Sequence, residues 1–143
     1  MFIGEYQHNL DTKGRVQIPA KLRVQLGKGA VVTRGLDNCL FLYPKLAWEA
    51  MAEKLSKLPI SQSSTRAFGR MMLAGAMAVD IDNQGRMLIP DYLRGFAKLK
   101  KNIVIAGLYS RLEIWDKAAW ETYKKGTEKS SSKIAEALSD LGV

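Results

Sequence analysis

The stretch that decides the fold is LDTKGRVQIP, residues 10–19, and a second copy, IDNQGRMLIP, occupies residues 81–90. Both copies keep the pattern Asp-x-x-Gly-Arg-x-x-Ile-Pro. An Asp side chain can accept a hydrogen bond from the backbone two residues further on, and glycine tolerates the positive φ that tight turns often need. Each copy therefore predicts a strand, a turn formed around Asp11 or Asp82, and a second strand.

The similarity of the two halves continues beyond this turn. Seven residues of the range 11–23 recur at a constant offset of 71 (82 − 11). Further along the chain an offset of 72 relates Gly35 to Gly107. The same offset relates Trp48 to Trp120, both of which we expect to be core anchors, with stacking on a ligand as the alternative. Two copies are too few for a solenoid, so we expect two similar halves that share one core around a pseudo-two-fold axis.

Hydrophobic periodicity and chain breakers predict the other elements. The first half is expected to contain strands over 2–10 and from residue 15, a helix over 20–26, a hairpin of strands over 30–35 and 39–43, and a helix over 45–55. Gly27 ends the first of these helices, because glycine favours helix C-termini. The second half repeats this order, and alternation in its first strand predicts that Met77, Val79 and Ile81 face inward.

Two segments lie outside the repeats. Residues 61–75 are expected to form a connecting helix with methionines on its apolar side and hydroxyl side chains available as N-caps. The polar stretch 127–133 is expected to be mobile. Beyond it, Ile134, Leu138 and Leu141 form an apolar helical stripe, which can pack on the same domain or on a neighbouring subunit.

Size and composition bound the class of protein. The chain has 143 residues, enough for one domain with a real core. Its net charge of +8 and pI of about 9.7 favour polyanionic partners, and residues 1–72 carry +6 of that charge. Cys39, the single cysteine, is expected to be buried and inert. No signal peptide and no apolar run of roughly 20 residues occurs, so we expect a soluble cytoplasmic protein without a membrane partner.

The sequence offers little chemistry for catalysis. His8 is the single histidine, so no partner completes a zinc site. No nucleophile elbow and no phosphate-binding glycine loop occurs. Symmetry could bring Asp11 and Asp82 together as a carboxylate pair, but Asp at the start of a turn is favoured for local hydrogen bonding. We therefore expect a non-enzyme without metal or cofactor, in which these two residues form turns.

Arg15 and Arg86 need another explanation, because a turn does not require arginine after glycine. Strand alternation puts each on the face opposite the apolar residues. An arginine guanidinium can bond the O6 and N7 atoms of guanine, and a two-stranded ribbon fits the major groove of DNA. Nearby cations would neutralise phosphates: Lys13, Lys21, Arg23 and Arg94. The alternatives are a solvated charge cluster or pairing of these arginines with acids within the fold. RNA binding is a further alternative, which the lack of aromatic residues in the turns disfavours.

The stretches LDTKGRVQIPAKLR and DIDNQGRMLIPDYLR closely resemble the two repeats of the MraZ family of bacterial transcriptional regulators. The resemblance covers nearly the whole chain, including FLYPKLAWEAM and LEIWDKAAWETY. It implies an α+β, mainly β fold of the AbrB-like (SpoVT-AbrB) type, a swapped-hairpin pseudo-dimeric β-barrel with flanking helices. The implied domains are repeat 1 over 5–47, connecting helices over 48–75, repeat 2 over 76–119, and a C-terminal helix and tail over 120–143.

The same resemblance implies a function. MraZ-like proteins bind short repeated elements of double-stranded promoter DNA in the division and cell-wall gene cluster, their own gene included, and assemble into closed homo-oligomeric rings. Such a protein is cytoplasmic and nucleoid-associated. The DNA-contacting motif of the family maps onto Asp11, Lys13, Gly14 and Arg15, and onto Asp82, Gly85 and Arg86. The alternative is an antitoxin-like protein-interaction module of the AbrB/MazE type.

The two copies differ in charge. Gln84 stands in the second copy where the first has Lys13. The second helix begins with Asp91 where the first has Ala20, and a carboxylate there would repel phosphate. We therefore expect the first copy to contribute more to electrostatic affinity.

Overall fold

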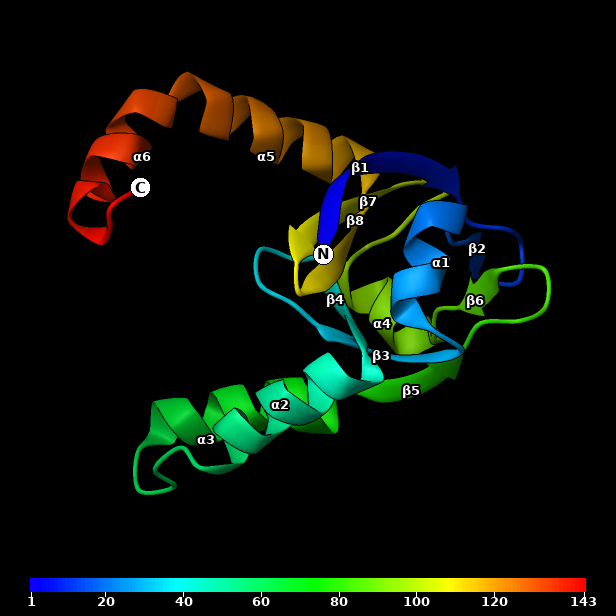
Figure 1. Cartoon of the computed structure of the whole chain (residues 1–143), viewed down its shortest axis with the longest axis horizontal. Helices are drawn as coiled ribbons and strands as arrows, with labels where there is room; N and C mark the ends of the chain where they lie inside the picture. The colour runs from blue at the N-terminus through cyan, green and yellow to red at the C-terminus, as the bar shows by residue number, and fades with distance from the viewer.

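The computed structural model describes residues 1–143 (Figure 1). The first half contains β1 (Phe2–Asn9), β2 (Arg15–Gln17), α1 (Ala20–Leu26), β3 (Gly29–Arg34), β4 (Leu40–Pro44) and α2 (Lys45–Ser56). The second half contains β5 (Met77–Asp80), β6 (Arg86–Leu88), α4 (Asp91–Phe96), β7 (Asn102–Tyr109), β8 (Arg111–Asp116) and α5 (Lys117–Lys129). The predicted order of elements therefore occurs twice, with small shifts of their ends.

The remaining elements connect and extend the two halves. α3 (Ser63–Gly69) runs into a π-helical turn (Arg70–Ala74), so the expected single connecting helix changes its hydrogen-bonding pattern midway. α6 (Ser131–Ala137) and a short 3-10 turn (Ser139–Leu141) follow α5. No helix combines the length and the apolar character needed to cross a bilayer.

The main sheet is built by exchange between the halves. Its six strands lie in the order β1-β7-β8-β4-β3-β5, and every neighbouring pair is antiparallel. The first strand of each half pairs with the third strand of the other half, β1 with β7 and β5 with β3. Interchange of the two halves leaves this order unchanged, so the strand order has the expected pseudo-two-fold symmetry.

A second, two-stranded ribbon of β2 and β6 completes the β structure. It is joined to the main sheet by single bridges, Leu10 with Val16 and Ile81 with Met87. The six-stranded sheet itself keeps two edge strands, β1 and β5. The fold is therefore α+β with a mostly antiparallel sheet. The six-stranded sheet is not itself closed into the expected barrel, and only single bridges connect it to the ribbon.

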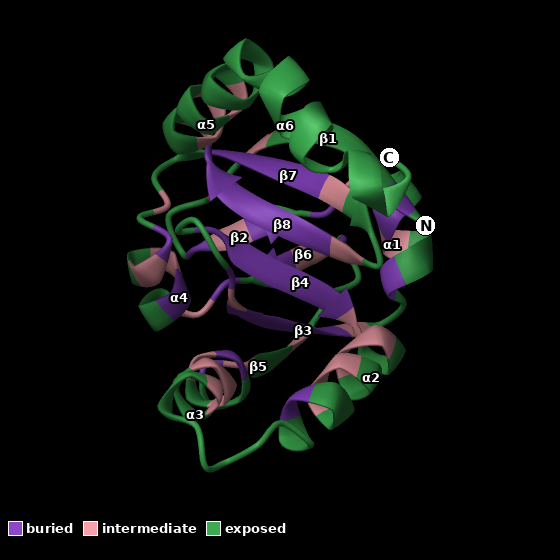
Figure 2. Cartoon of the chain, turned by 90° about the vertical axis from the view of Figure 1, so that its left-hand side faces the viewer, coloured by how far each residue is buried: buried purple, intermediate pink, exposed green.

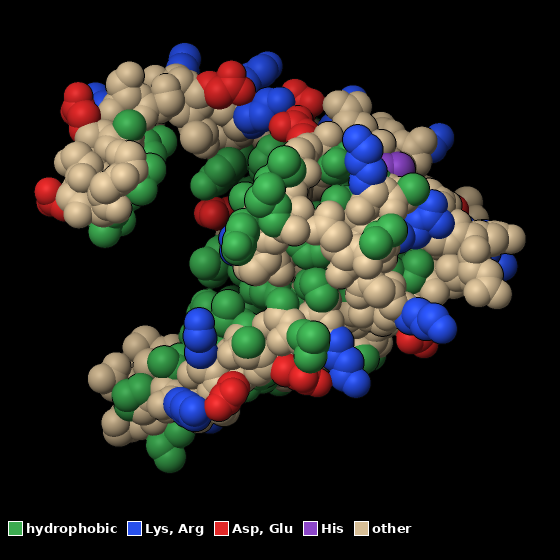
Figure 3. Space-filling model, in the orientation of Figure 1, with side chains coloured by type: hydrophobic (Ala, Val, Ile, Leu, Met, Phe, Trp, Pro, Cys, Tyr) green, Lys and Arg blue, Asp and Glu red, His purple; other side chains and the backbone are tan.

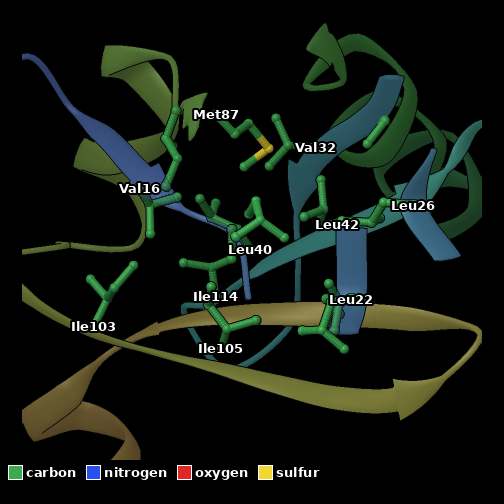
Figure 4. Close-up of a cluster of buried hydrophobic side chains, with 14 of the residues drawn as sticks. Val16, Leu22, Leu26, Val32, Leu40, Leu42, Met87, Ile103, Ile105 and Ile114 are labelled. Atoms are coloured by element: carbon green, nitrogen blue, oxygen red, sulfur yellow. The ribbon is translucent and has the colours of Figure 1, made fainter. Parts of the chain in front are cut away.

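The main core lies between the ribbon and the sheet. It contains 17 buried residues drawn from both halves, and Figure 4 shows Val16 and Met87 of the ribbon approaching side chains of β3, β4, β7 and β8. Since one such core buries both halves, neither half has a complete hydrophobic core of its own. Figure 2 shows the consequence: the buried residues concentrate in the central strands.

The other face of the sheet carries a smaller buried cluster that includes Cys39, Phe41 and Trp115. Cys39 is fully buried, as predicted, and desolvation raises the pKa of its thiol. Trp48 and Trp120 are half-buried against this cluster, so they anchor α2 and α5 to the sheet and are not central core residues.

The register of the strand pairs corrects the alignment of the two repeats that the sequence predicted. Asn9 pairs with Asn102, and its counterpart Asp80 pairs with Gly29, so the offset between β3 and β7 is 73 (102 − 29). The predicted equivalence of Gly35 with Gly107 is therefore wrong by one residue. Two residues are inserted between α4 and β7, and one is removed at the hairpin turn. The first hairpin turn has two residues at positive φ, Asp37 and Asn38, whereas the second has only Tyr109.

Three smaller expectations were also wrong. Met77 is 43% exposed, because it lies at the end of an edge strand beyond the core, whereas Val79 and Ile81 pack on the core as predicted. Residues 127–133 are largely helical, since the good helix formers Lys and Glu continue α5. The N-cap of α3 is Gln62, and no side chain caps that helix.

Candidate nucleic-acid interface

Each turn is organised by its aspartate. One carboxylate oxygen of Asp11 accepts hydrogen bonds from the backbone N–H groups of Lys13 and Arg15, both at 2.9 Å. Its other oxygen accepts from Arg15 Nε at 2.7 Å. The backbone bond from Arg15, opposed by partial desolvation and aided by the arginine side chain, lowers the pKa of Asp11 from 3.8 to about 2. The turn role predicted for Asp11 is confirmed.

The second turn repeats this arrangement atom for atom. Asp82 accepts from the backbone N–H groups of Gln84 and Arg86 at 2.9 Å and from Arg86 Nε at 3.0 Å. The pKa of Asp82 is lowered too, with the Arg86 backbone bond as the first cause. Each carboxylate thus bonds the backbone and the arginine of its own turn.

These contacts orient the two arginine side chains but leave the terminal nitrogens of their guanidinium groups unbonded. In Arg15 and Arg86 the Nε atom bonds the aspartate, while the two terminal nitrogens have no partner within the chain. The side chains are 30% and 31% exposed. Because one hydrogen bond fixes the base of each guanidinium, its outer edge is held ready to donate two parallel hydrogen bonds to an acceptor.

The ribbon brings the two turns together. Val16 is paired with Met87, and both side chains point into the core. Backbone bonds also cross between the halves, from the N–H of Ile18 to the oxygen of Gly85 and from the N–H of Ile89 to the oxygen of Gly14. The two turns project at the same end of the molecule, opposite the helical arms (Figure 1).

Glycine is favoured in both turns, for two reasons. Gly14 and Gly85 have φ of +83° and +78°, a region that disfavours residues with a Cβ. Each glycine is also covered by an arginine of the other half, Gly14 by Arg94 and Gly85 by Arg23, and a Cβ would overlap with either guanidinium.

The remaining predicted cations differ in their surroundings. Lys13 and Lys21 are exposed and form no ion pair. Arg94 donates to the backbone oxygen of Ile89 at 2.6 Å and pairs with Asp91 at 3.1 Å. Arg23 is half-buried, and its Nε is buried without a hydrogen-bond partner. The two lysines thus have no charged partner within the chain, whereas each of the two arginines lies over a turn glycine of the other half.

Two further residues belong to this surface and were not singled out from the sequence. Arg15 lies opposite Leu88, and Gln17 lies opposite Arg86, so these four side chains form the outward face of the ribbon. Leu88 is 52% exposed, and Gln17 donates from Nε2 to the oxygen of Gln84 at 2.8 Å. Both follow an arginine by two residues, and this spacing was the signal available in the sequence.

The single histidine and the single cysteine lie outside the ribbon. His8 is half-buried on β1, where desolvation lowers its pKa. No group of three or more His, Cys, Asp or Glu side chains is placed to hold a metal ion. The arrangement at the ribbon can donate hydrogen bonds and attract anions, which is the chemistry of recognition.

Comparison with known proteins agrees with this reading of the repeats. The family model of the MraZ protein, whose description also uses the term antitoxin-like, matches residues 1–71 and again residues 72–141. The chain is 48% identical to the transcriptional regulator MraZ of Caldanaerobacter subterraneus over 143 residues, all of both chains. It is 50% identical to that of Pediococcus pentosaceus and 46% identical to that of Natranaerobius thermophilus, again over the full length of both. The chain therefore belongs to the MraZ family of transcriptional regulators.

Proposed function

We propose that this protein regulates transcription by binding double-stranded promoter DNA through the β2–β6 ribbon. Arg15 and Arg86 contact base edges in the major groove, and the free outer edges of their guanidinium groups match the O6 and N7 acceptors of guanine. The observation that carries this proposal is the pair of equivalent turns at one end of the molecule, each with an arginine oriented by its own aspartate.

The surrounding residues have supporting roles in this proposal. Lys13 and Lys21 neutralise backbone phosphates, which supplies affinity and fixes the register without reading sequence. Gly14 and Gly85 supply the positive φ that shapes each turn. Arg23 and Arg94 hold these glycines, and the phosphate contacts expected for them stay a prediction.

The protein also acts as a homo-oligomer in this proposal, in the form of a closed ring. α5 and α6 extend from the body as one arm, and α2 and α3 form another (Figure 1). Figure 3 shows hydrophobic side chains gathered on the inner side of the space between the arms. A hollow there is lined by apolar residues including Leu36, Leu108, Trp120 and Tyr123. A ring would present several ribbons to several DNA elements, so that weak contacts add as avidity.

The resemblance to the MraZ family supports the choice of target. We propose that the protein acts in the cytoplasm on the nucleoid, at the promoter of the division and cell-wall gene cluster, its own gene included. No catalytic role is part of this proposal.

A footprint on the DNA upstream of its own gene, at two salt concentrations, tests the proposal. We expect protection of short, regularly spaced elements, with affinity that falls steeply as salt rises. A matched control is the double variant Lys54→Ala with Lys129→Ala, which removes two charges from the arms and should protect the same elements. Uniform protection without preferred elements would contradict sequence-specific recognition.

A further inference from the structure

Three adjoining hollows connect the first turn with the start of α5. The first is lined by Asp11, Gly14, Lys100 and Lys101 among others and has a volume of about 630 Å³. The second shares the two lysines and adds Asn102 and Lys117. The third shares Asn102 and Lys117 and reaches Asn9 at the end of β1. Neighbouring hollows share lining residues, so they adjoin one another, and we name the surface that they line together the lysine furrow.

The charge of the furrow is positive where it meets solvent. Lys100 and Lys101 are exposed and take part in no ion pair of the chain. The acids that line the furrow are engaged or covered. Asp11 pairs with Arg15, and Asp116 is buried and accepts from the backbone N–H groups of Lys100 and Ala119. Glu121, the third acid, is half-buried on α5.

The surface beside the second turn carries less positive charge at the positions equivalent to the furrow lysines and Asn9. The backbone oxygen of Lys101 accepts a hydrogen bond from the N–H of Leu10, and the backbone oxygen of Lys28 accepts one from the N–H of Ile81. Lys101 and Lys28 are therefore equivalent positions of the two halves. At the same offset of 73, Gly27 stands in place of Lys100 (100 − 27). Asp80 stands in place of Asn9, and Lys45 corresponds to Lys117. At these four positions the surface beside the second turn therefore holds two cations and one acid, whereas the furrow holds three cations and one asparagine.

We propose that the lysine furrow binds the sugar–phosphate backbone of the DNA next to the base pairs that Arg15 contacts. This inference rests on the proposed DNA-binding function and goes beyond it. An exposed ammonium group attracts phosphate as a point charge, and Lys100, Lys101 and Lys117 continue the line of cations away from the turn. Because the second turn lacks this extension, each subunit has a polarity on its DNA element, with the longer backbone contact on the side of the first turn.

The test compares two double variants of the full-length protein. Lys100→Gln with Lys101→Gln removes the centre of the furrow, and Lys28→Gln with Lys45→Gln removes the equivalent charges beside the second turn. Binding constants are measured at several salt concentrations for the upstream duplex and for a shuffled duplex. We expect the furrow variant to lose on the order of 10-fold in affinity for both duplexes and to lower the salt slope by about 2. In the control variant, the loss of affinity and the change in salt slope should each be at most about half of these values.

Hydroxyl-radical footprinting gives a second, geometric readout. The furrow variant should lose backbone protection on one flank of each element, while the base contacts at its centre persist. Equal losses for the two variants, or symmetric loss of protection, would overturn the furrow and leave the proposed function standing. A wild-type protein that binds no duplex would overturn both. The four substituted lysines are not core residues, and thermal unfolding would check that the variants stay folded.

Discussion

The guanidinium of Arg94 lies directly over Gly14, the glycine of the turn in the other half of the chain. Arg23 covers Gly85 in the equivalent way. Each turn of the ribbon is therefore covered by an arginine from a helix of the opposite repeat, so the packing of one turn involves both halves. This exchange parallels the pairing of β1 with β7 and of β5 with β3.

Replacement of Gly14 by alanine should separate these effects. The new Cβ strains a backbone at positive φ and displaces Arg94, whereas Gly27→Ala strains a similar φ of +73° with no atom within 4 Å. We expect about 1–3 kcal/mol of destabilisation from the strain in both variants. The loss of hydrogen bonds by Arg94 should add about 1 kcal/mol in Gly14→Ala alone. Urea unfolding measures the difference, and equal destabilisation of the two variants would mean that the contact contributes nothing.

Substitution of Arg94 distinguishes support of the turn from phosphate binding. If the guanidinium acts by holding the turn, Arg94→Ala lowers the preference for the upstream duplex over a shuffled one and leaves the salt slope almost unchanged. Arg94→Lys then fails to restore binding, because an ammonium lacks the planar fork. A phosphate contact would instead lower the salt slope by about 0.9 in Arg94→Ala, and lysine would rescue it. Titrations at four salt concentrations decide between the two results.

The turns should make folding stability sensitive to acid. The pKa of Asp11 is lowered from 3.8 to about 2 in the folded protein, chiefly by the bond from the Arg15 backbone, and the pKa of Asp82 is lowered too. A lowered pKa stabilises the folded state above the unfolded value, so this contribution is lost as pH falls from about 4 to about 2. Asp11→Asn should flatten that decrease in urea midpoints, while Asp140→Asn in the C-terminal segment should not.

The α6 arm should matter for assembly and not for folding. Ile134 and Leu138 are 42% and 37% exposed and lie outside the core. Replacement of both by aspartate should lower the oligomer mass measured by light scattering, because charged groups oppose burial between subunits. Affinity for multi-element DNA should fall with it, since avidity is lost. Lys133→Ala with Glu136→Ala is the control on the same helix, and an unchanged mass in the aspartate variant would exclude α6 from the interface.

Local signals in the sequence predicted the turns and their helices well. Asp11 and Gly14 each have a conformational preference strong enough to specify the turn, and Gly27 ends α1 as expected, with φ of +73°. The exposed arginine positions followed from strand alternation alone. These features are set by residues close in sequence, so no knowledge of distant contacts was needed.

Features that depend on contacts between the two halves were harder to predict from the sequence. Arg94 lies over Gly14, although the two residues are far apart in the chain, and no local sequence pattern predicts this contact. The shift that misaligned Gly35 with Gly107 arises from an insertion before β7 and a shorter turn after it, which nearly cancel in the sequence offset. The missing closure of the barrel depends on how far each bridge between sheet and ribbon extends, which tertiary packing decides.

The central claim is that Arg15 and Arg86 read DNA bases, and affinity for the upstream duplex tests it most directly. Arg15→Ala, Arg86→Ala and the double variant are compared with wild type on the upstream and the shuffled duplex. We expect each single change to cost about 1–3 kcal/mol of discrimination, with the larger loss for Arg15, and the double variant to bind both duplexes alike. If the double variant still prefers the upstream duplex as strongly as wild type does, the two arginines do not read the sequence.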